Sequence, residues 1–189
     1  MVGTHEHGGL SPDDVVLILG TGGVSIFALQ LANAVGCRVI GTSSSDAKRE
    51  RLRELGCRDS INYRTTPDWE KEVARLTEKR GVDCVVEVGG GGTLGKSMAS
   101  VAAGGRIALI GVLTGFGPPS DSLFPIVAKN ATIHGIYVGS RTDFLAMNAF
   151  LAAKAIRPII DRTFPFDAFA ESLEYLATGS HFGKVVLTL

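Results

Sequence analysis

The chain has 189 residues, of which 45% are hydrophobic and 20% charged, as expected of a globular domain with a sizeable core. Nineteen basic and nineteen acidic residues cancel, which excludes the strong basic excess of nucleic-acid- and membrane-binding surfaces. The three cysteines show neither disulfide nor metal spacing, and the sequence has no signal-peptide pattern or membrane-length apolar run. These features predict a soluble, cytoplasmic protein without nucleic-acid or membrane partners.

Short apolar runs alternate with helical patterns over residues 13–141. The expected strands are 15–19, 38–42, 60–62, 84–87, 106–110 and 132–137, and the expected helices are 24–35, 47–55, 68–79, 94–101 and 123–129. Strands that alternate with helices form βαβ units, and almost continuously apolar strands are covered on both faces. The sequence therefore predicts an α/β fold, a Rossmann-type doubly wound parallel sheet of six strands with helices on both faces.

Residues 142–189 do not continue this rhythm. They read as helical at 142–154 and 166–177 and as strands at 159–164 and 184–189. The pattern leaves open whether this C-terminal tail packs on the same sheet or belongs to a neighbouring domain.

The first expected strand runs into a glycine turn, GTGGVS, at residues 20–25. It matches G-x-G-x-x-G with Ser25 in place of the third glycine. In such a turn the first glycine permits the bend, the second lets the backbone approach a pyrophosphate, and the third lets the helix pack closely. The helix N-terminus then offers free N–H groups to phosphates. A turn that only connects two elements is the alternative, but the strand–turn–helix–strand context favours a dinucleotide site.

The second expected strand ends in the hydroxyl-rich sequence GTSSSDAKR. An NAD site usually carries an acidic residue about 20 residues after the first glycine. Here Ser43, Ser44 and Lys48 offer hydroxyls and a cation, which can bind a 2′-phosphate. We interpret Asp46 as the N-cap of the following helix. NADP(H) is therefore favoured over NAD(H), the alternative being that Lys48 and Arg49 only form a solvated helix face.

Several motifs occur in order along almost the whole chain: GGLSPDDVVLILGTGGVSIFALQLA, GTSSSDAKRERLRELGCRDSINYR, GVDCVVEVGGGGTL, GGRIALIGVL, GIYVGSR and GKVVL. Together they resemble the cofactor-binding half of a medium-chain dehydrogenase/reductase, a group that includes zinc-type alcohol dehydrogenases and zinc-free quinone oxidoreductases. The resemblance implies an oxidoreductase that transfers hydride between a nicotinamide cofactor and a carbonyl, an alcohol or an activated alkene.

The resemblance also implies a cofactor-binding role for particular residues. Residues 21–24 would lie under the pyrophosphate, Tyr63 would face the 2′-phosphate, and 137–138 would approach the nicotinamide. Arg141 would support the cofactor or its loop, unless it forms only a surface ion pair, and residues 183–184 would return near the cleft. The implied cofactor-binding residues are Gly20, Thr21, Gly22, Gly23, Val24, Ser43, Ser44, Lys48, Tyr63, Val88, Gly89, Ile110, Gly111, Val112, Tyr137, Val138 and Arg141.

Full-length members of the group carry a preceding barrel-like domain that supplies most of the substrate pocket. Residues 1–12 resemble the end of the linking helix, and 142–189 resemble the tail that returns to that domain. The histidines (His5, His7, His134 and His181) form no metal constellation and no convincing general base, so we expect neither zinc nor a catalytic residue in this chain. Cofactor binding with little or no turnover is therefore expected.

Two other classes of function are alternatives to this oxidoreductase role. A non-catalytic nucleotide-binding or dimerisation module is the first, since members of the group pair as homodimers through the sixth strand, here residues 132–138. A short-chain dehydrogenase is the second, and it fails because no tyrosine is followed four residues later by lysine.

Overall fold

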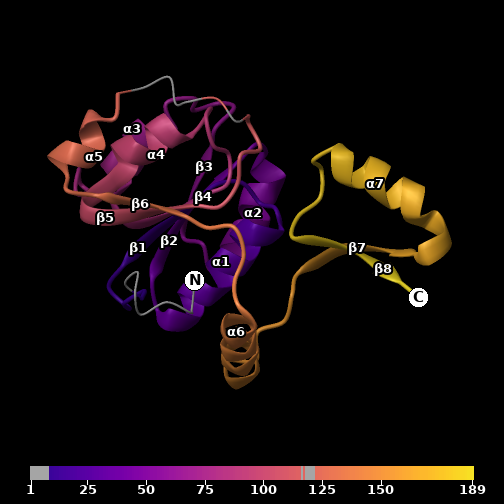
Figure 1. Ribbon diagram of the computed structural model, residues 1–189. Helices are drawn as coiled ribbons and strands as arrows, with labels where there is room; N and C mark the ends of the chain where they lie inside the picture. Colours follow the sequence, from indigo (N-terminus) through magenta and orange to yellow (C-terminus); the bar gives the residue numbers. More distant parts are fainter. Residues whose placement is uncertain (1–8, 116, 118–121) are drawn as a thin grey trace.

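The computed structural model describes residues 9–115, 117 and 122–189 (Figure 1). Six parallel strands form one sheet in the order β3-β2-β1-β4-β5-β6. Their bounds are β1 (Val15–Ile18), β2 (Arg38–Ser43), β3 (Asp59–Asn62), β4 (Val82–Glu87), β5 (Val101–Leu109) and β6 (Thr132–Gly135). The order reverses between β1 and β4, where ligands of open α/β sheets bind. The predicted doubly wound fold is confirmed.

Within the described residues, five helices connect these strands: α1 (Gly23–Val35), α2 (Asp46–Glu54), α3 (Trp69–Leu76), α4 (Leu94–Ser100) and α5 (Phe124–Ala128). Successive residues of a strand point to opposite faces of the sheet. Val16 and Ile18 accordingly belong to a core cluster that includes residues of α1 and α2, whereas Leu17 belongs to a second cluster that includes residues of α3 and α4. Figure 1 shows α3, α4 and α5 above the sheet and α1 below it.

The C-terminal tail forms a small sheet of its own. It contains α6 (Arg141–Ala153), β7 (Ile160–Pro165), a 3₁₀ turn (Phe166–Ala168), α7 (Phe169–Ala177) and β8 (Lys184–Thr188), and β7 pairs in parallel with β8. These strands and α7 stand apart from the six-stranded sheet in Figure 1. The loop before β8 nevertheless touches the glycine turn, because Gly183 N–H donates to the Thr21 carbonyl at 2.9 Å.

Some element bounds differ from the sequence-based expectation. The helix expected at 68–79 ends at Leu76, because Glu78 and Lys79 have left-handed backbone angles (φ 51° and 66°). β5 begins at Val101 instead of residue 106, and β6 ends at Gly135 instead of residue 137. The expected linking-helix remnant, 1–12, lies mostly outside the described residues, and 9–12 are not helical.

Candidate cofactor site

A cleft of about 860 Å³ opens at the carboxyl ends of β1, β2 and β4. Its size is typical of small-molecule sites, and its place coincides with the reversal of strand order. The cleft brings together ten of the predicted cofactor residues: Gly20, Thr21, Gly22, Gly23, Val24, Ser44, Lys48, Tyr63, Val88 and Gly89.

The glycine turn forms the floor of the cleft. Gly20 adopts a left-handed conformation (φ +72°), which favours glycine, and Gly22 is the N-cap residue of α1. A Cβ atom at Gly22 would have no heavy atom within 4 Å, so the backbone there faces open space. Ser25 fits at the third glycine position because its buried hydroxyl donates to the Leu19 carbonyl at 2.6 Å. The turn therefore presents the N–H groups of a helix N-terminus to the cleft.

The junction of β2 and α2 supplies Ser44 and Lys48 to the cleft, and the residue after β3 supplies Tyr63. Ser43 is buried and lies outside the lining. The Lys48 ammonium donates to the Gly179 carbonyl at 2.7 Å, and burial lowers the pKa of Lys48. This part of the cleft is thus polar and carries one cation.

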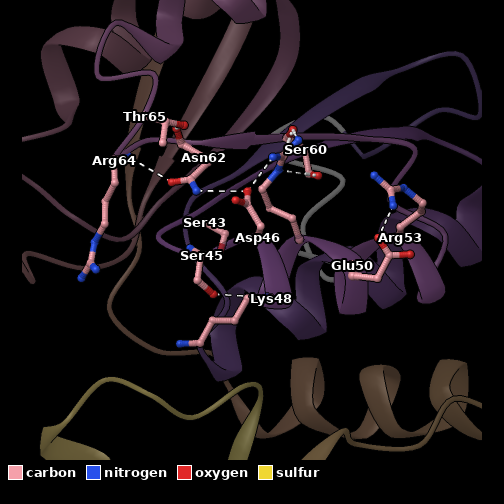
Figure 2. Close-up of polar contacts among 11 residues, drawn as sticks. Ser43, Ser45, Asp46, Lys48, Glu50, Arg53, Ser60, Asn62, Arg64 and Thr65 are labelled. Carbon is pink, nitrogen blue, oxygen red and sulfur yellow. Dashed lines mark hydrogen bonds and ion pairs between the residues drawn. The ribbon is translucent and has the colours of Figure 1, made fainter.

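The expected N-cap at Asp46 is wrong. The N-cap of α2 is Ser45, whose hydroxyl accepts from Lys48 N–H at 3.3 Å, and Asp46 is the first helical residue. The Asp46 carboxylate accepts from Arg49 (2.8 Å) and from Asn62 (3.1 Å), and the bond to Arg49 is the main cause of its lowered pKa. Figure 2 shows Asp46 turned toward Asn62 and Lys48 pointing the other way. The acidic group therefore lies outside the cleft lining.

Glu87, at the end of β4, fixes the backbone of the cleft wall that follows this strand. Its carboxylate is fully buried and accepts from Gly89 N–H (2.7 Å), Gly90 N–H (3.1 Å) and the Thr93 hydroxyl (2.6 Å). The second carboxylate oxygen accepts from Ser97 at 2.5 Å. Because Gly89 and Thr93 line the cleft, these bonds fix its wall. Sequence reasoning missed this role, although a carboxylate ending an apolar strand was a visible signal.

Seven predicted residues lie outside the lining: Ser43, Ile110, Gly111, Val112, Tyr137, Val138 and Arg141. After β5, Leu113 and Thr114 line the cleft instead, and Thr114 N–H donates to the Gly89 carbonyl at 2.7 Å. Tyr137 and Val138 are exposed, 95% and 78% respectively. The cofactor-binding roles of these seven residues stay predictions.

The tail closes one side of the cleft with Leu176, Gly179 and His181. The Lys184 side chain covers the start of α1, since a Cβ at Gly23 would lie 2.6 Å from Lys184 Cε. Residues 183–184 therefore contact the glycine turn, although neither residue lines the cleft itself. His181 was not predicted to lie there, because it is distant from the glycine turn in sequence.

A zinc centre does not fit the described residues. They contain no group of three or more His, Cys, Asp or Glu side chains placed to hold a metal ion. His5 and His7 lie outside the described part of the chain. In that same part, no helix has the length and apolar character needed to cross a membrane.

Comparison with known proteins places the chain in a family. A family profile described as zinc-binding dehydrogenase matches residues 23–153. The zinc-type alcohol dehydrogenase-like protein C1773.06c of Schizosaccharomyces pombe is 44% identical over 192 residues, covering 100% of this chain and 55% of that protein. The chain thus spans about half the length of such relatives.

Similarity to solved structures supports the same family assignment. An alcohol dehydrogenase-like protein of Sinorhizobium meliloti 1021 matches with a TM-score of 0.91 and 41% identity. The match covers 97% of this chain and 53% of that protein's chain. An NAD-dependent alcohol dehydrogenase also matches, with a TM-score of 0.86 and 33% identity, covering 95% of this chain and 52% of that one. Mycobacterial Rv1454c complexed with NADPH matches with a TM-score of 0.83 and 25% identity, covering 98% of this chain and 60% of that one. With its six-stranded sheet and glycine turn, the chain belongs to the zinc-binding dehydrogenase family of oxidoreductases, within the medium-chain dehydrogenase/reductase superfamily.

Proposed function

We propose that this chain is the NADP(H)-binding domain of an oxidoreductase acting on a carbonyl, an alcohol or an activated alkene. The observation that carries the proposal is the cleft at the reversal of strand order. Its floor is a glycine turn at a helix N-terminus, and its described lining includes Lys48 and Lys96 but no acidic side chain. An anionic dinucleotide fits this combination of open backbone and cations.

The bound nicotinamide would supply or accept the hydride, and the chain would position it. In this proposal the backbone N–H groups of residues 21–24 bind the pyrophosphate, with Lys184 beside them. Ser44, Lys48 and Tyr63 hold the adenosine 2′-phosphate. Val88 and Gly89 form the wall against which the cofactor lies, and the Glu87 carboxylate holds the Gly89 N–H in place.

The preference for NADP(H) rests on Ser44 and Lys48, since matched structures include both an NAD-dependent enzyme and an NADPH complex. Lys48→Ala is expected to weaken NADPH binding about tenfold, the effect of losing one charge-assisted contact, while NADH binding changes little. Calorimetric titration of the unmodified chain and of Lys48→Ala with NADPH and with NADH measures these affinities. Lys71→Ala, which removes an exposed lysine paired with Asp68 on α3, is the control. Equal affinity of the unmodified chain for NADPH and NADH would contradict the preference.

We further propose that the chain alone binds cofactor with little or no turnover. The cleft offers no side chain that we assign as a catalytic acid or base, and the chain spans about half of its relatives. Residues 13–141 would form the cofactor domain, and 142–189 would complete a catalytic domain. The three cysteines are free and buried, which favours a cytoplasmic location.

A homodimer through β6 is a second proposal, carried by the edge of the sheet. β6 is the last strand in the sheet order, and apolar side chains remain exposed on and after it: Ile133 (37%), Ile136 (37%), Tyr137 (95%) and Val138 (78%). Such an edge can pair with its copy. We expect a dimer in size-exclusion chromatography with light scattering, and a monomer for Ile133→Lys. A monomeric unmodified chain would refute the proposal.

A further inference from the structure

The tail brings a histidine to the adenosine side of the cleft. His181 lines the cleft together with Gly179, whose carbonyl accepts from Lys48 at 2.7 Å. The next residue, Phe182, is buried in the core cluster that contains residues of α1 and α2. Its ring also packs under the Arg51 guanidinium, 4.1 Å from the ring centroid. His181 is therefore held in a fixed place near Lys48.

The surroundings of the two ring nitrogens indicate which one carries the proton of the neutral His181 imidazole. Its Nδ1 is buried and has no hydrogen-bond partner among the described residues. A neutral imidazole carries one N–H and one acceptor nitrogen, and a buried N–H without an acceptor is costly. The proton therefore belongs on Nε2, which leaves the ring with one N–H to donate.

The surroundings of this ring disfavour its charged form. Burial, and then the positive charge of Lys48 on α2, lower the pKa of His181. Asp161 on β7 acts in the opposite direction, but its carboxylate is already bonded to Arg51 (2.8 Å) and Tyr175 (2.6 Å). His181 thus offers an N–H donor beside the cation of Lys48.

We propose that His181 is a specificity-determining residue for NADP(H), donating from Nε2 to the 2′-phosphate that Lys48 attracts. The tail then supplies part of the adenosine subsite, 137 residues along the chain from Ser44, which forms the other part with Lys48 and Tyr63. This inference rests on the proposed dinucleotide function, and it adds a contact that the glycine and serine motifs do not contain.

Binding of 2′,5′-ADP and of 5′-ADP, measured by calorimetry, separates this contact from a structural role. His181→Phe keeps a ring but removes the donor, and we expect it to weaken 2′,5′-ADP binding on the order of tenfold while 5′-ADP binding is unchanged. His181→Gln, which places an amide N–H at similar reach, should restore most of the affinity. His181→Leu is a second donor-free variant, and thermal unfolding checks that each variant folds.

If His181→Phe binds both nucleotides more weakly by the same factor, or binds both as tightly as the unmodified chain, the inference is overturned and the cofactor proposal stands. If the unmodified chain binds neither nucleotide, both proposals fall.

Discussion

Replacing Gly22 with valine is expected to weaken NADPH binding on the order of 100-fold or more while the chain stays folded. Gly22 has an ordinary backbone conformation (φ −76°), and a Cβ there meets no heavy atom within 4 Å. The added side chain would therefore occupy cleft space that the pyrophosphate needs, without a clash inside the protein. Loss of a favourable N-cap residue should lower the free energy of unfolding by about 1 kcal/mol at most.

Gly9→Val is the matched control for Gly22→Val. A Cβ at Gly9 also meets nothing within 4 Å, and Gly9 lies outside the cleft. Calorimetry with NADPH and urea unfolding of the three proteins measure both effects. Normal NADPH affinity in Gly22→Val would show that the cofactor does not approach the glycine turn.

Replacing Phe182 with alanine is expected to lower the free energy of unfolding by about 4 kcal/mol. The ring is 1% exposed and packs in the core cluster formed with α1 and α2, although it comes from the tail. The substitution leaves a cavity and removes the cation–π contact with Arg51. NADPH affinity should fall as well, because the loop that carries His181 and Lys184 loses its anchor.

Phe166→Ala is the control for Phe182→Ala, since Phe166 belongs to the same tail and is 60% exposed. Its substitution should change the free energy of unfolding by less than about 1 kcal/mol. Urea unfolding followed by circular dichroism measures both variants. Equal effects of the two substitutions would mean that the tail is not anchored through Phe182.

The fold of residues 13–141 was predictable because its signals are local. Each buried strand is an apolar run, and turns or helical patterns separate the runs, so strand number and parallel pairing followed. The pairing of β7 with β8 was not predictable, because periodicity identifies a strand but not its partner. The end of α3 depends on left-handed backbone at Glu78 and Lys79, which residue type alone does not reveal.

The site was predictable where one motif holds its residues together, as in the glycine turn and in Ser44 and Lys48. At the start of α2 two adjacent residues can both cap a helix, and the structure selects Ser45 over Asp46. His181 and Glu87 escaped prediction as site residues for another reason. Their roles depend on contacts between segments far apart in the chain or on burial of a carboxylate, which no spacing rule expresses.

A crystal structure of this chain grown with NADP⁺ tests the central claim most directly. The account predicts the pyrophosphate over the backbone N–H groups of residues 21–24 and the 2′-phosphate between Ser44, Lys48 and His181. A dinucleotide bound elsewhere, or one whose adenosine end lies away from the β2–α2 junction, would contradict it.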